Sequence, residues 1–291
     1  MQAITADRLI ATGTALLVKA GVPDAGLDAR LLLQHCTGWS RSALILNGAH
    51  TVGQELADRY RQLVSQRCSR VPLHYLTGSR EFWSMEFLVT PAVLIPRPET
   101  EFLLESALAA CPRTPACRAL DMCTGSGVIA VVLAKELGCE VDAVDISPAA
   151  LHVAALNVAA HKVEDLVRLI GSDLFAALVP GPSYDLILSN PPYIANEQLE
   201  HLEPEVARAE PRLALSGGAS GLEVIERIVD EAERYLKPQG LLFLEIGADQ
   251  EAGVTRLLTA PQRCYDECSV LKDWAGRPRV LKARFGGRSF R

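Results

Sequence analysis

The tetrapeptide Asn190-Pro191-Pro192-Tyr193 holds the residues of this chain best suited to chemistry. It directly follows residues 184–189, Tyr-Asp-Leu-Ile-Leu-Ser, whose mostly apolar side chains predict a strand. The Asn190 side-chain oxygen and the Pro191 carbonyl can each accept one N–H of an NH₂ group, and the two prolines stiffen the loop. Tyr193 can stack on a planar amide or base. The tetrapeptide therefore indicates a site that holds an amide or amino nitrogen.

A nitrogen of this kind is a poor nucleophile, because its lone pair is delocalised into the neighbouring π-system. Two oxygens that accept its N–H groups favour a pyramidal nitrogen, aligned with an electrophilic methyl group, and such positioning lowers the barrier. Transfer from a sulfonium is a direct displacement and needs no covalent enzyme intermediate. The alternative, a proline-rich turn without function, is disfavoured because the tetrapeptide occurs together with the two motifs that follow.

A glycine-rich turn, Asp121-Met-Cys-Thr-Gly-Ser-Gly127, links a predicted strand to a predicted helix. Gly125 and Gly127 permit a tight turn and the close approach of a ligand, and the helix N-terminus offers free N–H groups. A dinucleotide site and a plain tight turn also fit this pattern. Residue 130 is Ala where the full Gly-x-Gly-x-x-Gly has glycine, which weakens the dinucleotide interpretation. S-adenosylmethionine has no pyrophosphate and needs no third glycine.

Two carboxylates sharpen the cofactor prediction. Asp145 ends the next predicted strand, eighteen residues after Gly127, where it can accept from both ribose hydroxyls of an adenosine. Asp173 follows the third strand and is placed to accept from the adenine amino group, with Leu174 or Phe175 against the ring. Asp142 lies on the opposite face of its strand and is excluded.

Alternating strand and helix patterns from residue 117 onward position these motifs. Such alternation is typical of a doubly wound, Rossmann-like parallel sheet, which binds ligands at the carboxyl ends of its strands. Only a loop joins the last two predicted strands, so they pair antiparallel and one strand near the C-terminus runs against the rest. The expected strands are residues 118–122, 140–145, 167–170, 184–189, 241–246, 263–270 and 279–284, and the expected helices are residues 99–110, 128–137, 148–160 and 222–236.

The part of the chain before this pattern is expected to form a separate small domain. Apolar residues at three-and-four spacing in 29–33 and 56–64 predict short helices packed as a bundle. We expect an N-terminal helical domain over residues 1–77, a hairpin linker over 78–92, and a methyltransferase domain over 93–291.

Composition narrows the classes of function. The chain has 291 residues and a net charge of −6, which argues against tight non-specific nucleic-acid binding. No apolar run approaches the roughly 20 residues that a membrane helix needs, and no signal peptide is recognisable, so a cytoplasmic location is expected. Residues 1–75 hold eight basic and five acidic residues. This excess suits an acidic or RNA-bound protein partner, or a merely solvated helix surface.

The eight cysteines do not predict a metal site. None forms a Cys-x-x-Cys pair, no histidine stands at zinc-ligand spacing, and the single pair Cys264 and Cys268 cannot close a tetrahedral site. We expect free thiols in a reducing compartment and no bound metal.

Over nearly its whole length the chain resembles the PrmC/HemK family of release factor glutamine methyltransferases. Asn190-Pro-Pro-Tyr193 alone is shared with DNA amino-methyltransferases, whereas Ile95-Pro-Arg-Pro-Glu-Thr-Glu101 is more specific to this family. The resemblance also includes the glycine-rich turn, Pro72-Leu-His-Tyr-Leu-Thr-Gly78, Ala214-Leu-Ser-Gly-Gly218 with Gly221-Leu222, and Asp273-Trp-Ala-Gly-Arg-Pro-Arg279.

The resemblance implies N5-methylation of the glutamine in the Gly-Gly-Gln motif of peptide chain release factors, with S-adenosyl-L-methionine as the cofactor. It implies that the N-terminal helices dock the release factor. It places the glutamine on Asn190, Pro191, Pro192 and Tyr193, and the entrance on Arg97, Glu99 and Phe102. With the residue arguments above, the expected cofactor contacts are Asp121, Cys123, Thr124, Gly125, Ser126, Gly127, Asp145, Ile146, Asp173, Leu174 and Asn190.

This chain departs from the family at two positions. The family often has glycine where this chain has Cys123, and an aromatic residue where it has Leu174. These departures concern the details of adenosine packing.

Several alternatives stay open at this point. A DNA or RNA amino-methyltransferase, or a ribosomal-protein glutamine methyltransferase, shares the tetrapeptide and the cofactor. An NAD-dependent oxidoreductase shares the glycine-rich turn, but no proton-transfer histidine or Lys–Tyr pair is evident. A binding protein without catalysis is a further possibility. Arg97 has its own alternative, a loop-pinning ion pair with Glu99 or Glu101. His74 and Tyr75 are expected to pack, and Glu245 to orient a strand end.

Overall fold

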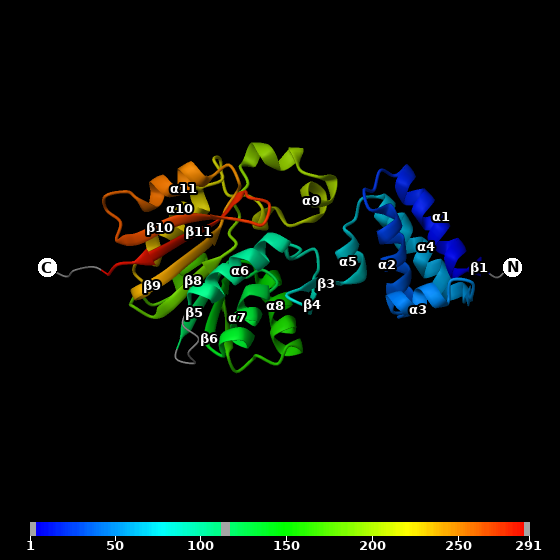
Figure 1. Ribbon diagram of the computed structural model, residues 1–291, viewed down its shortest axis with the longest axis horizontal. Helices are drawn as coiled ribbons and strands as arrows, with labels where there is room; N and C mark the ends of the chain where they lie inside the picture. The colour runs from blue at the N-terminus through cyan, green and yellow to red at the C-terminus, as the bar shows by residue number, and fades with distance from the viewer. Residues whose placement is uncertain (1–3, 112–116, 288–291) are drawn as a thin grey trace. The chain divides into compact units, whose positions relative to one another are not determined.

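The computed structural model describes residues 4–111 and 117–287, and the chain divides into two compact units (Figure 1). The first, called here the N-terminal unit, comprises Met1–Ser79 together with Glu203–Ala209. The second, called here the sheet unit, comprises Arg80–Leu202 and Glu210–Arg291. No helix among the described residues is both long enough and apolar enough to cross a membrane.

The N-terminal unit is a bundle of short helices, as the periodicity predicts. Its core contains Leu9, Leu32, Leu33 and Tyr60, and a pair of two-residue strands closes one end. Thr5 caps the first helix by accepting from the Arg8 N–H. The elements are β1 (Ile4–Thr5), α1 (Ala6–Lys19), α2 (Ala25–Thr37), α3 (Arg41–Leu46), β2 (Thr51–Val52), α4 (Gln54–Cys68), α5 (Leu73–Thr77) and α9 (Pro204–Ala209).

Helix α9 joins this unit although it is far away in the sequence. The Arg67 guanidinium donates to Asp28 at 2.7 Å and to Glu205 at 2.9 Å, and Arg70 donates to Glu205 at 2.5 Å. Burial opposes ionisation of Glu205, but the hydrogen bonds from Arg70 and Arg67 outweigh it and lower the pKa of this carboxyl. Local sequence patterns did not predict this contact.

The sheet unit contains a seven-stranded sheet in the order β10-β11-β9-β8-β5-β6-β7. Strand β11 pairs antiparallel with β9 and β10, and the other pairs in the sheet are parallel. The doubly wound Rossmann-like sheet with one antiparallel strand near the C-terminus is therefore confirmed. The strands are β5 (Arg118–Met122), β6 (Glu140–Asp145), β7 (Val167–Gly171), β8 (Tyr184–Ser189), β9 (Leu236–Glu245), β10 (Tyr265–Lys272) and β11 (Pro278–Phe285).

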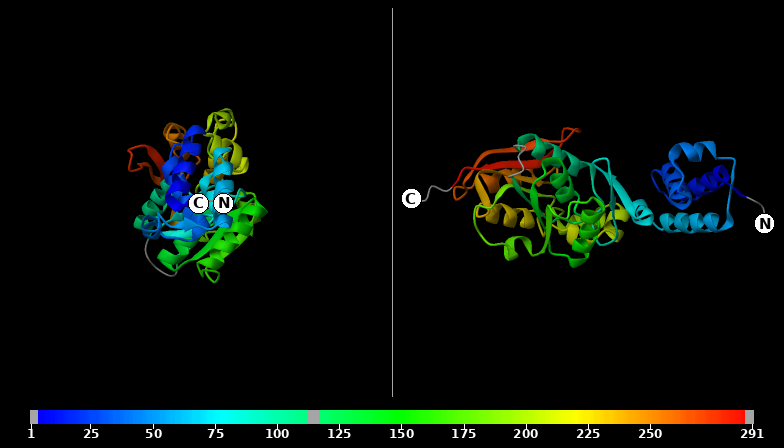
Figure 2. Two further views of the ribbon diagram at one scale, coloured as in Figure 1. Left: turned by 90° about the vertical axis from the view of Figure 1, so that its right-hand side faces the viewer. Right: turned by 90° about the horizontal axis from the view of Figure 1, so that it is seen from below.

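Helices cover both faces of this sheet (Figures 1 and 2). Alternate residues of one strand enter different core clusters, Leu186 and Leu188 one cluster and Ile187 the other, as the two-residue period of a strand requires. The first cluster contains residues of α6 (Pro98–Ala110), α7 (Val128–Leu137) and α8 (Pro148–Ala160); the second contains residues of α10 (Glu223–Ala232) and α11 (Glu251–Leu258). Short 3₁₀ helices complete the unit at Leu174–Ala177, Asn196–His201 and Arg212–Ala214.

Two predicted boundaries are wrong by four or five residues. The helix predicted over 222–236 ends at Ala232, and β9 begins at Leu236 rather than at residue 241. Leu236 pairs with Tyr184, and a register shift follows before Leu241. The bulge accommodates Lys237-Pro238-Gln239-Gly240, which the sequence pattern had suggested to be a turn between elements.

Residues 79–88 form a hairpin. Its strands are β3 (Ser79–Phe82) and β4 (Met85–Leu88), and both turn residues, Trp83 and Ser84, have positive φ. This is the two-residue turn that matches the twist of a hairpin.

The side chain of Asn157, on α8, fixes this hairpin to the glycine-rich turn. Its Oδ1 accepts from the Leu88 N–H at 2.8 Å, and its Nδ2 donates to the carbonyls of Leu88 and Ser126 at 3.0 and 2.8 Å. Asn157 is only 1% exposed, so water cannot replace these bonds.

Replacement of Asn157 by alanine is expected to lower the free energy of unfolding of the sheet unit by about 2–4 kcal/mol, because one buried and two partly buried backbone groups lose their partner. Urea unfolding followed by circular dichroism measures this. The matched control is Leu156→Ala, at an exposed neighbour on the same helix, with an expected change within about 0.5 kcal/mol. Equal stability of the two variants would contradict the prediction.

Candidate active site

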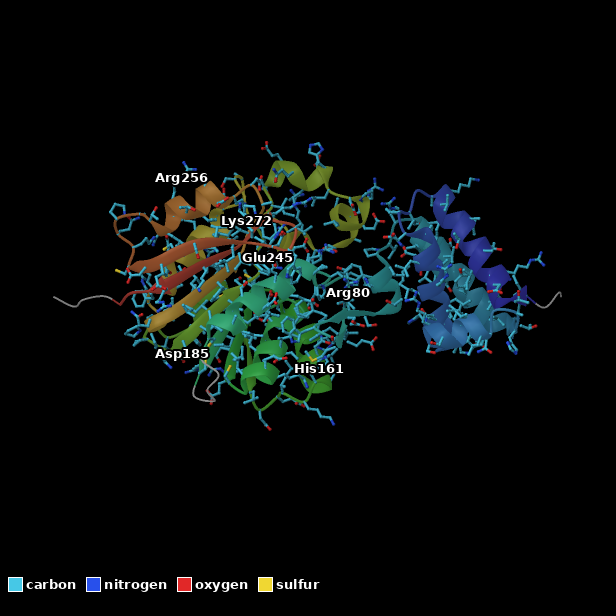
Figure 3. The ribbon with its side chains drawn as sticks, in the orientation of Figure 1. Arg80, His161, Asp185, Glu245, Arg256 and Lys272 are labelled. Carbon is cyan, nitrogen blue, oxygen red and sulfur yellow. The ribbon has the colours of Figure 1, made fainter. Side chains whose placement is uncertain are left out.

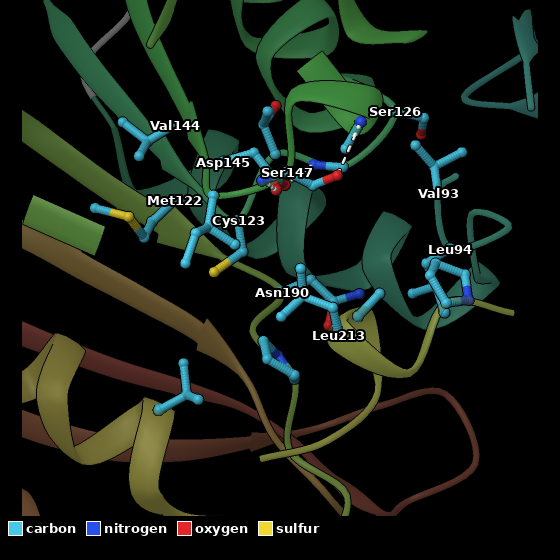
Figure 4. A pocket seen from close by; sticks show the side chains of 18 of the residues that line it. Val93, Leu94, Met122, Cys123, Ser126, Val144, Asp145, Ser147, Asn190 and Leu213 are labelled. Atoms are coloured by element: carbon cyan, nitrogen blue, oxygen red, sulfur yellow. Dashed lines mark hydrogen bonds between the residues drawn. The ribbon is translucent and has the colours of Figure 1, made fainter. Parts of the chain in front are cut away.

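A cavity of about 270 Å³ lies at the carboxyl ends of β5, β6, β7 and β8 (Figure 4). All of its lining residues belong to the sheet unit. Parallel strands bring the loops that follow them to one edge of the sheet, and the reversal of strand order there opens a crevice. In Figure 4, Asn190 and Leu213 lie opposite Asp145 and Ser147, with Val93 and Leu94 to one side.

The cavity brings many of the sequence-predicted residues together. Those that line it are Cys123, Thr124, Gly125, Ser126, Asp145, Ile146, Asp173, Leu174, Asn190 and Pro192. Those that do not line it are Asp121, Gly127, Pro191, Tyr193, Arg97, Glu99 and Phe102.

Backbone conformation explains the glycines of the turn. Gly127 has φ +82°, and a Cβ there would lie 3.2 Å from the Ala154 side chain. Gly125 has φ +55°, and its N–H donates to Asp145 at 2.9 Å. Cys123 also has a positive φ, +62°, which a side chain rarely adopts. Glycine fits this position without strain, and cysteine occupies it at an energetic cost.

Asp121 lies beneath the turn rather than in the cavity wall. It is fully buried, and its Oδ2 accepts from the Thr124 hydroxyl at 2.5 Å and from the Ala130 N–H at 3.1 Å. Burial raises the pKa of this carboxyl to about 7. Its Oδ1 has no partner among the described residues, so one buried acceptor remains for a donor.

The two other predicted carboxylates differ in their surroundings. Asp145 accepts from the Ser147 N–H on one oxygen and from the Gly125 N–H on the other, each at 2.9 Å. Burial raises its pKa, although these backbone bonds oppose the shift. Asp173 forms an exposed ion pair with Arg227 at 3.0 Å, and both residues line the cavity. The sequence patterns did not indicate Arg227.

The Asn190 side chain is fixed by one hydrogen bond. Its Nδ2 donates to Thr100 Oγ1 at 3.0 Å, which leaves Oδ1 as the group available to a ligand. Tyr193 turns away from the cavity: its ring packs against the second core cluster, and its hydroxyl donates to Glu245 at 3.2 Å. Pro192 lines the cavity instead.

The expected entrance residues hold other parts of the unit. Arg97 donates to both oxygens of Glu210, at 2.8 and 2.7 Å, so the alternative pairing with Glu99 or Glu101 named the wrong partner. This bond fixes the segment whose residues Pro211, Leu213 and Ala214 line the cavity.

Two neighbours of Arg97 on α6 have structural partners. Glu101 accepts from the Trp83 N–H at 2.8 Å. Phe102 packs edge-on against Trp274 at 5.6 Å between ring centroids. Asp142, which was excluded from the site, pairs instead with Arg118, Arg168 and Tyr184.

Sequence reasoning missed part of the cavity wall. Thr100 belongs to the motif Ile95–Glu101, yet no pattern linked it to Asn190. Two further loops line the cavity, one through residues 92–94 and 96 and the other through residues 211, 213 and 214. Tertiary contacts bring these two loops to the cavity. The preference of Ile95-Pro96-Arg97-Pro98 for extended backbone was the available signal for the first loop.

This strand order, with a glycine-rich turn, Asp145 and Asn190 around one cavity, defines a Rossmann-like methyltransferase. A crystal structure of a methyltransferase from Pyrococcus furiosus shares this fold, with a TM-score of 0.55 and 21% identity over 77% of this chain and 100% of that chain. Family models for the PrmC N-terminal domain and the methyltransferase small domain match residues 8–78 and 99–219.

Curated relatives give the family. The release factor glutamine methyltransferase of Cereibacter sphaeroides is 44% identical over 92% of this chain and 94% of its own length. That of Escherichia coli is 39% identical over 89% and 91%. The chain belongs to the family of release factor glutamine methyltransferases.

Replacement of Arg97 by alanine is expected to loosen residues 210–217, because it leaves the buried Glu210 carboxylate without its partner. Amide hydrogen exchange in this segment should accelerate on the order of tenfold, or about 1.4 kcal/mol in the opening equilibrium. The matched control is Arg212→Ala, at an exposed arginine of the same segment. Unchanged protection in the Arg97 variant would show that the ion pair does not hold the segment.

Proposed function

We propose that this protein transfers the methyl group of S-adenosylmethionine to N5 of the glutamine in the Gly-Gly-Gln motif of peptide chain release factors. The observation that carries the proposal is the orientation of Asn190, whose Nδ2 is bonded to Thr100 while its Oδ1 is left for the cavity. The relatives of Cereibacter sphaeroides and Escherichia coli, both release factor glutamine methyltransferases, support the same substrate.

The chemistry of the cavity wall fits S-adenosylmethionine. Asp145 keeps acceptor capacity on both oxygens, as two ribose hydroxyls require. Buried Asp121 supports the cofactor site from behind the cavity wall, because it holds Thr124 and the Ala130 N–H of the glycine-rich turn. Ile146 and Leu174 supply apolar surface for a base, and Asp173 an acceptor on its edge. When bound, the cofactor supplies an electrophilic methyl group on a sulfonium.

The residues of the 190–193 loop bind and orient the acceptor. Asn190 Oδ1 accepts one N–H of the glutamine amide, and the Pro191 carbonyl accepts the other. Together they turn the nitrogen lone pair out of conjugation. Pro192 in the wall and Tyr193 behind it keep the loop stiff. No residue forms a covalent bond with the substrate, and the proton leaves the nitrogen for water.

The remaining assignments follow from this proposal. Residues 1–77 dock the release factor, 78–92 link, and 93–291 form the catalytic domain. Arg97 and Phe102 shape the entrance through their contacts with Glu210 and Trp274, and Glu99 stands between them on α6. Since release factors act on ribosomes, the protein works in the cytoplasm, without a membrane partner or stable nucleic-acid binding.

Mass spectrometry tests the proposed function. Purified release factor, incubated with this protein and S-adenosylmethionine, should gain one methyl group on the Gly-Gly-Gln glutamine. DNA, RNA and ribosomal proteins serve as competing substrates under the same conditions. Methylation of one of these, with none on release factor, would refute the assignment.

Replacement of Asn190 by alanine should abolish detectable transfer while affinity for S-adenosylhomocysteine changes only slightly, because the lost oxygen binds the acceptor.

Replacement of Asp145 by alanine should weaken the affinity for S-adenosylhomocysteine on the order of tenfold or more, because two hydroxyls lose a charged acceptor. Calorimetric titration and single-turnover transfer separate the two effects. Wild-type turnover in the Asn190 variant would disprove the mechanism.

A further inference from the structure

Four segments far apart in the sequence meet at one buried carboxyl group, that of Glu245. This residue ends β9 (Figure 3) and is 1% exposed. Its Oε2 accepts from the Thr100 hydroxyl at 2.8 Å, and its Oε1 accepts from the Tyr193 hydroxyl at 3.2 Å. A buried carboxyl group costs free energy unless it is compensated, so its presence beside the 190–193 loop calls for an explanation.

The direction of the hydrogen bonds gives that explanation. An ionised carboxylate only accepts, so Thr100 must donate its single hydroxyl proton to Glu245. The Thr100 oxygen then has only lone pairs to offer Asn190, and at 3.0 Å it accepts from Nδ2. The planar Asn190 amide is thereby held with Oδ1 as its available group. Without the carboxylate, the Thr100 proton is free to turn toward Asn190, and the amide is free to flip.

We propose that Glu245 is a positioning residue for methyl transfer. Through Thr100 it sets which end of the Asn190 amide faces the acceptor, and through Tyr193 it holds the other end of the same loop. A flipped Asn190 presents an NH₂ group to the substrate NH₂ group, and two donors cannot pair. This inference rests on the proposed function and deepens it.

The groups around Glu245 come from three further elements. Arg279 of β11 is the neighbouring cation; it lies 3.6 Å from Asp273 and donates to the Ile246 carbonyl at 3.2 Å. Asp273 also accepts from the N–H groups of Ala275 and Arg277. The motif Asp273–Arg279 therefore forms a turn that holds Arg279 near Glu245. Glu99 of α6 is the neighbouring anion, beside Thr100, and Tyr193 lies in the loop.

These surroundings make the hydrogen bonds from Asn190 through Thr100 to Glu245 sensitive to pH. Burial raises the pKa of Glu245 to about 7, against the opposing effects of Thr100, Arg279 and Tyr193. Above this pKa the carboxylate only accepts, and the Asn190 amide is held. Below this pKa, the protonated carboxyl can donate to Thr100, and the Thr100 proton is then free to point toward Asn190. The Asn190 amide flips, and its Oδ1 accepts that proton. We therefore expect kcat at saturating cofactor to rise with pH through about 7.

The test compares Glu245→Gln with wild type on intact release factor. The variant should lose kcat on the order of 100-fold, with little change in S-adenosylhomocysteine affinity, because a misdirected group close to the reacting atoms costs about this much. Its kcat should also lack the rise near pH 7, since glutamine does not titrate. The matched control is Glu233→Gln, at another buried carboxyl that accepts from the Cys264 N–H outside the cavity, and it should keep both properties.

A second pair of variants breaks the same relay without removing the charge. Thr100→Val should reproduce the loss of kcat, and Thr100→Ser, which keeps the hydroxyl, should recover most of it. A purely structural role would lower stability and activity together and would leave the pH profile unchanged.

The outcomes separate the two proposals. A wild-type protein that does not methylate release factor refutes the proposed function itself. An active wild type with a Glu245→Gln or Thr100→Val variant of equal kcat overturns only the positioning role. A rise near pH 7 that stays in Glu245→Gln and is lost in Asp121→Asn, whose buried carboxyl also has a pKa of about 7, overturns the pH dependence assigned to Glu245.

Discussion

The hydrogen bond from Asn190 Nδ2 to Thr100 Oγ1 joins the end of β8 to the first turn of α6, and the chemistry of the cavity depends on it. An amide side chain has a donor end and an acceptor end of nearly equal size, so packing alone does not choose between them. Only a directed partner does. Because that partner stands on a helix, the position of α6 decides which atom of Asn190 meets the substrate.

The helix is in turn fixed by local chemistry. Pro98 begins α6, where its missing N–H is no loss, and Arg97 is held by Glu210. On the other side of the cavity, Asn157 ties α8 to the glycine-rich turn. A few buried polar contacts thus keep the loops around the cavity in register with the rigid sheet, which suits a reaction that depends on alignment.

The elements from β5 to α8 follow from sequence because their signals are local. Gly138 ends α7 in the left-handed conformation, and Ser147 with Pro148 begins α8, so the predicted bounds agree with the structure. The start of β9 was predicted wrongly because the apolar Leu236 fits the pattern of a helix as well as that of a strand. The partner of Arg97 and the place of α9 were not predictable, since each depends on a residue more than 100 positions away.

The same division applies to the cavity. Residues that directly follow strands were placed by topology, whereas Asp121 and Tyr193 lie behind the wall because their partners hold them there.

Cys123 occupies a position of the turn where a side chain costs conformational energy. Its left-handed backbone is strained, and burial raises the pKa of its thiol to about 12, so the sulfur stays neutral. A neutral thiol is no nucleophile, and this agrees with a displacement in which the protein orients two reactants and bonds covalently to neither.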